Sequence, residues 1–192
     1  MVTNEETKET VAIDPGGSLR KIDTYILEEE LLIQGILLTH GHFDHIMGID
    51  ALRKYNKAPV YISEEDYPLL SDAKGNASKT FVHHGFTYSG GTPMKDGDII
   101  KAAGYKFNLI KTPGHTPGSC CYYVESEGVL FSGDTLFRAS IGRTDLEGGS
   151  EDIYESIKER LFVLPQDTIV YPGHGMTTTI GYEKENNPFF RK

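Results

Sequence analysis

Short apolar runs alternate with amphipathic stretches along the chain, and this alternation predicts an α/β protein. The apolar runs predict strands at 10–13, 35–39, 59–62, 99–102, 106–111, 121–125, 129–132 and 168–171. Helical spacing of apolar residues predicts helices at 18–29, 44–55 and 151–162, and an acidic turn at 63–66 predicts a further short helix. The polar, glycine-rich segment 71–93 has no period, so we expect a long loop, and loops of this length are often functional.

The chain length and the apolar runs bound the class of protein. A length of 192 residues suits one domain, which we assign to residues 1–192. No apolar stretch approaches the roughly 20 residues that a membrane-spanning helix needs, so no membrane partner is expected. The first ten residues contain no apolar segment typical of secretory signals. Cys120 and Cys121 are adjacent and cannot readily pair with each other, which favours a reduced, cytoplasmic chain.

The charge balance argues against nucleic acid as a partner. The chain carries 19 Lys and Arg residues against 28 Asp and Glu residues, a formal net charge of −9. Such a surface repels phosphate backbones on average. A local cationic centre, such as a bound metal, can override this average for a small anionic molecule.

The densest group of metal-binding side chains is the run from Thr39 to His45, which reads THGHFDH. His40 and His42 are two residues apart directly after a predicted strand. Extended residues at this spacing point to the same side, so both imidazoles can reach one ion. Asp44 and His45 follow where the loop turns into a predicted helix, and they can serve a second ion. Imidazole and carboxylate together suit zinc, iron or manganese.

Three later strands end in the same way, with a glycine or proline turn and one metal-binding side chain. These side chains are His115, Asp134 and His174. Strand ends are rigid positions, and small residues beside them let the backbone approach an ion. Seven donors at four strand ends therefore describe a site for two metal ions.

The chain resembles the metallo-β-lactamase superfamily, and within it the glyoxalase II-like hydrolases. The resemblance rests on five motifs: THGHFDH (39–45), TPGHTPGS (112–119), SGDTLF (132–137), GRTDLEGG (142–149) and YPGHG (171–175). It implies a four-layer αββα sandwich with the site at one edge of the two sheets. The flavodiiron relatives carry a glutamate where His42 stands, so that branch of the family does not fit.

The resemblance also implies a role for each donor. His40, His42 and His115 would hold the first divalent metal, Asp44, His45 and His174 the second, and Asp134 would bridge both. Zinc is the expected metal, and iron and manganese are the alternatives.

Two metals at such a site share one water and lower its pKa toward about 7, so that hydroxide is present at neutral pH. Asp44 and Asp134 would be catalytic because they fix the metals and orient this hydroxide. The sequence offers no evident acid for the leaving group, which favours a thioester, since the pKa of a thiol is about 8.5. The expected activity is hydrolysis of a small thioester of the lactoylglutathione type.

Two departures from the family limit this expectation. The glutathione thioesterases of the family carry a helical domain after the sandwich, and this chain ends soon after His174. Their Lys and Tyr after the bridging aspartate correspond to Arg143 and Asp145. The identity of the thiol half of the substrate is therefore not assigned. Arg143 either binds an anionic substrate or pairs with Asp145. The alternative activity is that of the persulfide dioxygenases, which also carry Gly-Arg-Thr-Asp (142–145) and use one iron, here held by His40, His115 and Asp134.

The sequence at the N-terminus predicts an exposed strand edge in one of the sheets. Family members begin with an additional strand containing an Asn-Cys-Tyr segment, and Met1, Val2 and Thr3 match only the end of that region. An uncovered strand edge invites pairing with another chain. A homodimer or reduced stability is therefore expected.

Overall fold

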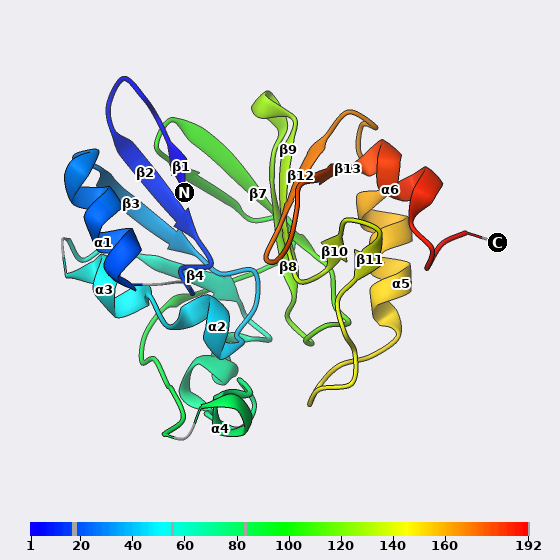
Figure 1. The fold of residues 1–192 in the computed structure, drawn as a ribbon, viewed down its shortest axis with the longest axis horizontal. Coiled ribbons are helices and arrows are strands. Elements are labelled where there is room, and N and C mark those ends of the chain that lie inside the picture. Colours follow the sequence, from blue (N-terminus) through cyan, green and yellow to red (C-terminus); the bar gives the residue numbers. More distant parts are fainter. Residues whose placement is uncertain (17–18, 55, 83, 192) are drawn as a thin grey trace.

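Two β-sheets lie face to face, and helices cover the outer face of each (Figure 1). The computed structural model describes residues 1–16, 19–54, 56–82 and 84–191. The first sheet has the order β1 (Val2–Thr3), β2 (Glu9–Ile13), β3 (Leu32–Leu37), β4 (Val60–Ser63), β5 (Thr92–Met94). The second has the order β13 (Thr178–Thr179), β12 (Ile169–Pro172), β9 (Val129–Gly133), β8 (Cys120–Val124), β7 (Tyr105–Lys111), β6 (Ile99–Ala102). A small pair, β10 (Leu136–Phe137) and β11 (Ser140–Ile141), follows β9.

The helices complete four layers, as expected for the αββα sandwich. The first sheet is covered by α1 (Leu19–Glu28), α2 (Phe43–Ile46) and α3 (Ile49–Arg53). The second is covered by α5 (Asp152–Ser156), the π-helical turn η3 (Ile157–Leu161) and α6 (Ile180–Asn186). Short turns of helix lie in the connections: η1 (Tyr67–Ser71), α4 (Ser78–Phe81) and η2 (Glu125–Glu127). Within the described residues, no helix is both long enough and apolar enough to cross a bilayer.

Three apolar clusters fill the three interfaces between the four layers. One joins the first sheet to its helices, one lies between the sheets, and one joins the second sheet to α5 and α6. Strand β8 shows how a continuous apolar run serves two interfaces, because side chains alternate along a strand. Cys120 and Tyr122 belong to the cluster between the sheets, whereas Cys121 and Tyr123 face the helices. Both cysteines are free and buried, and burial raises the pKa of the Cys121 thiol to about 12.

The strand directions bring four loops to one edge of the sandwich. Strands β2, β3 and β4 are parallel, and β9 is parallel to β12. Strand β7 also runs in the direction of β9, because each is antiparallel to β8 between them. The loops after β3, β7, β9 and β12 are the four that carry the predicted metal-binding side chains.

The single helix predicted over 44–55 is wrong. Two short helices, α2 and α3, stand in its place, and Tyr55 lies outside the described residues. The interruption falls at Gly48, whose N–H donates to the carbonyl oxygen of Pro15. A Cβ atom at Gly48 would lie 2.0 Å from that oxygen. A tertiary contact to the segment before α1 therefore breaks the helix that the local pattern favours.

The predicted loop 71–93 contains ordered elements that its polar pattern concealed. Helix α4 lies within it, and edge strand β5 begins at its end and pairs in parallel with β4. The short helix predicted after 63–66 is present as η1. The helix predicted over 151–162 forms as α5 followed by the π-helical turn η3. Of the helix predicted over 18–29, residues 19–28 form α1, and Ser18 lies outside the described residues.

The N-terminal residues form the edge of the first sheet. Strand β1 pairs antiparallel with β2 through Val2 and Val11. Met1 and Val2 line a cavity of about 570 Å³ that reaches Phe131 and Tyr171 of the second sheet. The rings of Phe131 and Tyr171 stack with centroids 5.6 Å apart. A homodimer through this edge stays a prediction.

Candidate metal centre

The seven predicted donors meet at the edge where the four loops converge. His40 and His42 follow β3, and Asp44 and His45 lie in α2. His115 follows β7, Asp134 follows β9 and His174 follows β12. Six of the seven, together with Asp14, form overlapping groups in which all donor atoms lie within 4.8 Å of one another: His40, His42 and His115; Asp44, His45 and His174; and Asp14, His40 and His45. Both sheets therefore contribute to one centre.

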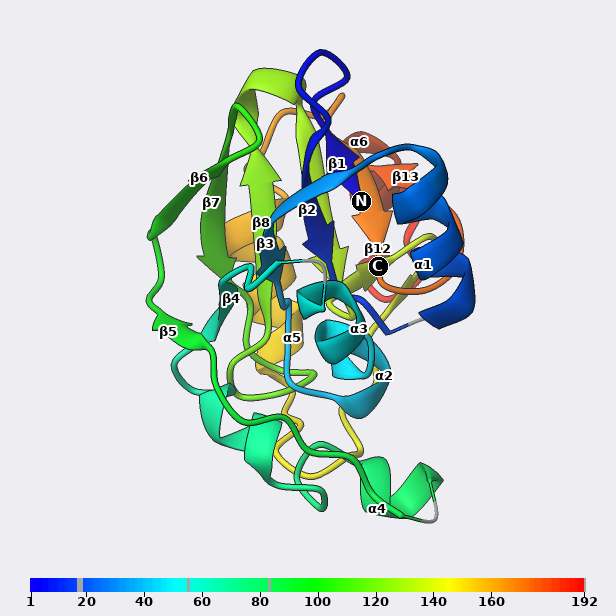
Figure 2. The same cartoon turned by 90° about the vertical axis from the view of Figure 1, so that its left-hand side faces the viewer.

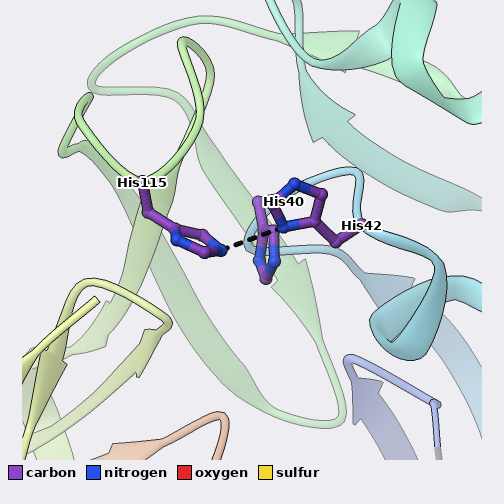
Figure 3. A group of neighbouring side chains, drawn as sticks. All are labelled: His40, His42 and His115. Atoms are coloured by element: carbon purple, nitrogen blue, oxygen red, sulfur yellow. Dashed lines mark hydrogen bonds between the residues drawn. The ribbon is translucent and has the colours of Figure 1, made fainter. Parts of the chain in front are cut away.

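The first group consists of three buried histidines. His40, His42 and His115 are 1%, 4% and 3% exposed. His42 Nδ1 lies 2.9 Å from His115 Nε2. Figure 3 shows the three rings, carried by two different loops, turned toward one another. Three buried imidazoles turned toward one another are an arrangement typical of a metal site.

In His40 and His115, hydrogen bonds made by Nδ1 leave Nε2 free to bind a metal. His115 Nδ1 donates to the carbonyl oxygen of Arg143 at 2.8 Å, so Nε2 keeps its lone pair in the neutral ring. Thr39 Oγ1 donates to Asp14 Oδ2 at 2.6 Å and can accept from His40 Nδ1 at 3.1 Å. The Nε2 atoms of His40 and His42 are buried without a hydrogen-bond partner in the described part of the chain. A divalent cation fits this set because it would satisfy lone pairs that are otherwise buried unpaired.

The protonation of these rings suits metal binding. Burial lowers the pKa of His40 well below its ordinary value, and the neighbouring histidines lower it further. Burial and His115 lower the pKa of His42 to about 4. Both rings are therefore neutral at pH 7, as a metal ligand must be.

The second group is open to solvent on one side. His45 Nε2 lies 3.2 Å from His174 Nε2, and His174 Nε2 lies 3.3 Å from Asp44 Oδ2. The side chains of Asp44 and His174 are 41% and 57% exposed, whereas that of His45 is 3% exposed. A second cation fits between these two imidazoles and the carboxylate, in contact with solvent.

Asp134 lies between the two groups. Its Oδ1 atom is 3.5 Å from His45 Nε2, and its Oδ2 atom is 3.7 Å from both His115 and His174. Oδ1 is buried and has no hydrogen-bond partner among the described residues. Burial raises the pKa of this carboxyl group, against the opposing effect of the histidines. Oδ2 thus lies at the same distance from a histidine of each group, and Oδ1 faces the open group, so this carboxylate can reach an ion in either group.

Asp14 supports the centre, and the sequence analysis missed it. Its carboxylate accepts hydrogen bonds from the Thr39 N–H at 2.8 Å and from His45 Nδ1 at 3.0 Å. Burial lowers the pKa of His45, but Asp14 and the other carboxylates more than compensate, and the pKa rises to about 9 in the metal-free protein. A carboxylate behind a metal-binding imidazole fixes its orientation and raises its basicity. The signal was present, because Asp14 follows strand β2 and precedes a Pro-Gly turn, as the other donors follow their strands.

Asp66 is a second supporting residue that sequence reasoning missed. The sequence places it in the acidic turn before a short helix, and in the structure it is fully buried. It accepts hydrogen bonds from the Gly41 N–H at 2.8 Å, the Gly118 N–H at 2.7 Å and Thr116 Oγ1 at 2.7 Å. Asp66 therefore ties the loop of His40 and His42 to the loop of His115.

Two glycines allow the loops to approach closely. A Cβ atom on Gly173 would lie 2.4 Å from Asp134 Oδ1, and 2.7 Å from an atom of the His45 ring. Gly133 has a φ of +49°, and a Cβ atom there would lie 2.1 Å from Thr39 Oγ1. A larger residue at Gly173 would displace Asp134 and His45, and one at Gly133 would displace Thr39, which contacts His40.

Arg143 has two contacts, one through its backbone and one through its side chain. Its carbonyl oxygen orients His115, as described above. Its guanidinium donates to both carboxylate oxygens of Asp145, at 2.6 and 2.7 Å, and this pairing lowers the pKa of Asp145 to about 2. The Arg143 side chain is 53% exposed and lines the cavity beside the donors. The pairing of Arg143 with Asp145 that the sequence offered as one alternative is present. The Arg143 side chain also lies where it could contact a molecule in the cavity.

Known proteins are similar to this chain in sequence over most of its length. "Probable metallo-hydrolase YqgX" of Bacillus subtilis (strain 168) is 40% identical over 178 residues, covering 92% of this chain and 84% of that protein. "Hydroxyacylglutathione hydrolase GloC" of Haemophilus influenzae (strain ATCC 51907 / DSM 11121 / KW20 / Rd) is 34% identical over 197 residues, covering 96% and 89%.

Solved structures share the fold. The crystal structure of BLEG-1 B3 metallo-beta-lactamase superposes with a TM-score of 0.94 at 40% identity, covering 100% of this chain and 92% of that one. TTHA1623 "in a di-iron-bound form" gives 0.80 at 36% identity, covering 92% and 87%. ETHE1 from Myxococcus xanthus gives 0.78 at 30% identity, covering 97% and 76%.

The family itself is set by the sequence match over most of the chain. Residues 2–174 match the model of the Metallo-beta-lactamase superfamily, a span that includes all seven donors. The chain belongs to the metallo-β-lactamase superfamily, whose members bind divalent metals.

Proposed function

We propose that this chain hydrolyses small thioesters with the help of two divalent metal ions. The observation that carries the proposal is the full set of seven donors, arranged in two groups around Asp134. The similarity to a protein named hydroxyacylglutathione hydrolase supports a thioester as the substrate.

In this proposal each donor has a defined task. His40, His42 and His115 hold one ion in the buried group, and Asp44, His45 and His174 hold the other in the open group. When bound, the ions supply a nucleophilic hydroxide at neutral pH and polarise the substrate carbonyl. Asp134 sets the spacing of the two sites, and Asp44 reaches the solvent side, where it can accept a hydrogen bond from the attacking water. A thiolate leaves without a proton donor, because the pKa of a thiol is about 8.5.

Zinc is the metal that we propose, with iron or manganese as alternatives. Neutral imidazoles and carboxylates accept all three ions, so the donor set alone does not choose among them. The similarity to TTHA1623 in its di-iron-bound form makes iron the alternative to test first.

Persulfide oxidation is the second candidate activity. It would need one iron, held by His40, His115 and Asp134. The similarity to ETHE1 from Myxococcus xanthus is the reason to test this activity. The assembled group of Asp44, His45 and His174 favours the hydrolase, because a mononuclear centre has no use for a second complete donor group.

The deciding experiment combines metal analysis with a substrate screen of the purified chain. We expect about two metal ions per chain, and hydrolysis of S-lactoylglutathione or a small acyl thioester. The screen includes a β-lactam, because BLEG-1 is named a β-lactamase. It also includes a glutathione persulfide, with measurement of oxygen uptake. Persulfide-dependent oxygen uptake by a protein with one iron, without thioester hydrolysis, would overturn the proposal.

His174→Ala separates the two activities in one variant. It removes a donor of the open group and leaves His40, His115 and Asp134 in place. Thioester hydrolysis should fall at least about 100-fold, beyond the loss typical of a supporting residue, whereas a mono-iron oxygenase should keep its iron. The matched control is His84→Ala, an exposed histidine outside the centre.

A further inference from the structure

A cavity of about 280 Å³ opens beside the donors, and the residues that line the rest of it are mostly apolar. Phe43, Ala77, Phe81 and Leu146 supply apolar surface, and Arg143 supplies the basic side chain. Figures 1 and 2 place α4, which carries Phe81, at the same end of the molecule as α2 and the segment after β11. The volume lies just under the range of about 300–1,000 Å³ usual for ligand pockets, so the cavity suits a small group.

Two aromatic rings form the most prominent part of these walls. The rings of Phe43 and Phe81 stack with centroids 5.9 Å apart and planes 18° from parallel. Phe43 lies between the donors His42 and Asp44 in the sequence, so the stacked pair begins directly beside the metal-binding side chains. Phe81 is 54% exposed and lines the cavity, so its ring offers apolar surface to a molecule bound there.

A network of buried hydrogen bonds fixes the segment that carries Phe81. Asn76 is fully buried, donates to the carbonyl oxygen of Phe86 at 2.8 Å and accepts from the Ser78 N–H at 2.9 Å. The carbonyl oxygen of Asn76 accepts from the Phe43 N–H at 3.0 Å, which links this segment to the metal-binding loop. Ala77 adopts a φ of +63°, a conformation that costs energy for a residue other than glycine. The aromatic pair is therefore held in place by its surroundings.

The charge near the apolar walls is already balanced. Arg143 makes its bidentate pair with Asp145, whose pKa of about 2 keeps that carboxylate charged at neutral pH. Among the described residues that line the cavity, the apolar side thus offers contact surface without an unpaired basic side chain, and a carboxylate bound against Phe81 would lose hydration without gaining a partner.

We infer that Phe43, Phe81 and Leu146 form a specificity subsite for an uncharged, apolar acyl group of a few carbon atoms. The inference rests on the proposed thioesterase function and specifies its substrate class: an aliphatic acyl thioester, whose acyl chain lies against the stacked rings while its carbonyl faces the donors. The thiol half then extends toward solvent past Arg143.

A series of acyl thioesters of N-acetylcysteamine tests the subsite by activity. Each buried CH2 group favours binding by about fourfold, so the wild type should prefer butyryl, which has two more such groups than acetyl, by about 15-fold in kcat/KM, mainly through KM. Phe81→Ala should reduce this preference to about twofold, whereas Phe81→Leu should keep most of it. The control is Phe189→Ala, a ring of similar exposure (47%) near the C-terminus. An unchanged butyryl preference in Phe81→Ala would overturn the subsite.

A binding measurement tests the subsite independently of catalysis. The chain contains no tryptophan, so Phe81→Trp places a single fluorescent indole in the wall. The zinc-loaded variant is titrated with the S-butyl thioether of N-acetylcysteamine, which cannot be hydrolysed, and with its 3-carboxypropyl counterpart. We expect a saturable fluorescence change with the butyl compound at concentrations at least about tenfold lower than with the charged one. Equal responses, or none, would overturn the subsite.

The two measurements separate this inference from the proposed function. Selective binding of the butyl thioether without hydrolysis of any thioester would support the subsite and reject the thioesterase. Thioester hydrolysis without acyl-chain preference would support the thioesterase and reject the subsite.

Discussion

The two donor groups face each other across Asp134, and they differ in how far they are open to solvent. His40, His42 and His115 are at most 4% exposed, whereas the side chains of Asp44 and His174 are 41% and 57% exposed. The buried histidines contact Thr39, the Arg143 carbonyl and one another. In the open group, Asp14 fixes His45, while Asp44 and His174 contact each other and the remaining donors.

This difference separates two requirements of a hydrolytic metal centre. The buried group is organised before any ion binds, so an ion there should bind tightly and exchange slowly. The open group gives water and substrate access, so its ion should be the first to leave. Substitutions can disturb both groups together, each group in turn, or the rim beside them, which is formed by Arg143.

The largest effect is expected from Asp134→Ala, because this carboxylate contacts both groups. Metal content measured by mass spectrometry should fall by about two ions per chain, the number that such a bridged site holds. Asp134→Asn, which keeps the shape but not the charge, should retain part of the metal. Full metal content in Asp134→Ala would refute the bridging assignment.

Asp66→Ala should weaken the buried group by releasing its two loops from each other. It leaves two buried N–H groups without an acceptor, at a cost of about 1–3 kcal/mol each. The melting temperature of the metal-free protein should fall by roughly 5–15 °C, at about 2–4 °C per kcal/mol for a chain of this size. Glu64→Ala, at an exposed neighbouring position, is the control and should melt within a degree or two of the wild type. An unchanged melting temperature in Asp66→Ala would show that the loops hold without this carboxylate.

Asp14→Asn should act mainly on the open group, through His45. Loss of a carboxylate behind a metal-binding imidazole lowers metal affinity by about 10- to 100-fold. Competition with a chelator should therefore release one ion per chain from the variant before the wild type loses any. Loss of both ions together would contradict the separate behaviour of the two groups.

The same variant makes a prediction about pH. In the metal-free wild type the pKa of His45 is raised to about 9, so protonation of this ring favours the folded state. This contribution is fully present below the ordinary histidine pKa of about 6.5 and is lost as the pH rises through about 9. The stability advantage of wild type over Asp14→Asn should shrink across that window, and an NMR titration should find a lower His45 pKa in the variant. A His45 pKa that stays near 9 would exclude Asp14 as its cause.

The smallest effect is expected at the rim, from Arg143→Ala. The side chain is exposed and already paired, so its attraction for a substrate carboxylate is screened by solvent. We expect about a tenfold loss in kcat/KM, through KM, for a thioester with a carboxylate in its thiol half. A neutral thioester of similar size should be much less affected. Equal losses for both would assign Arg143 to shaping its loop through Asp145.

The strands and the seven candidate donors could be located in the sequence because both depend on local signals, whereas the four layers were implied by the family resemblance of the motifs. Each donor follows a strand end, and the apolar runs and their spacing mark the strands themselves. The misses arose from contacts between distant segments. Gly48 interrupts a helix because it meets Pro15, and Asp66 is buried because it accepts hydrogen bonds from Gly41 and from residues of the 112–119 loop. Spacing along the chain carries no information about such partners.

The distribution of the donors over both sheets has a consequence for the synthesis of the protein. His40 is made early, and His174 follows 134 positions later in the chain (174 − 40). A ribosome-bound chain that ends before β12 can present the three buried histidines but lacks a donor of the open group. We therefore expect the two ions to be acquired in sequence during biosynthesis, and hydrolytic activity to arise only after the second sheet has closed.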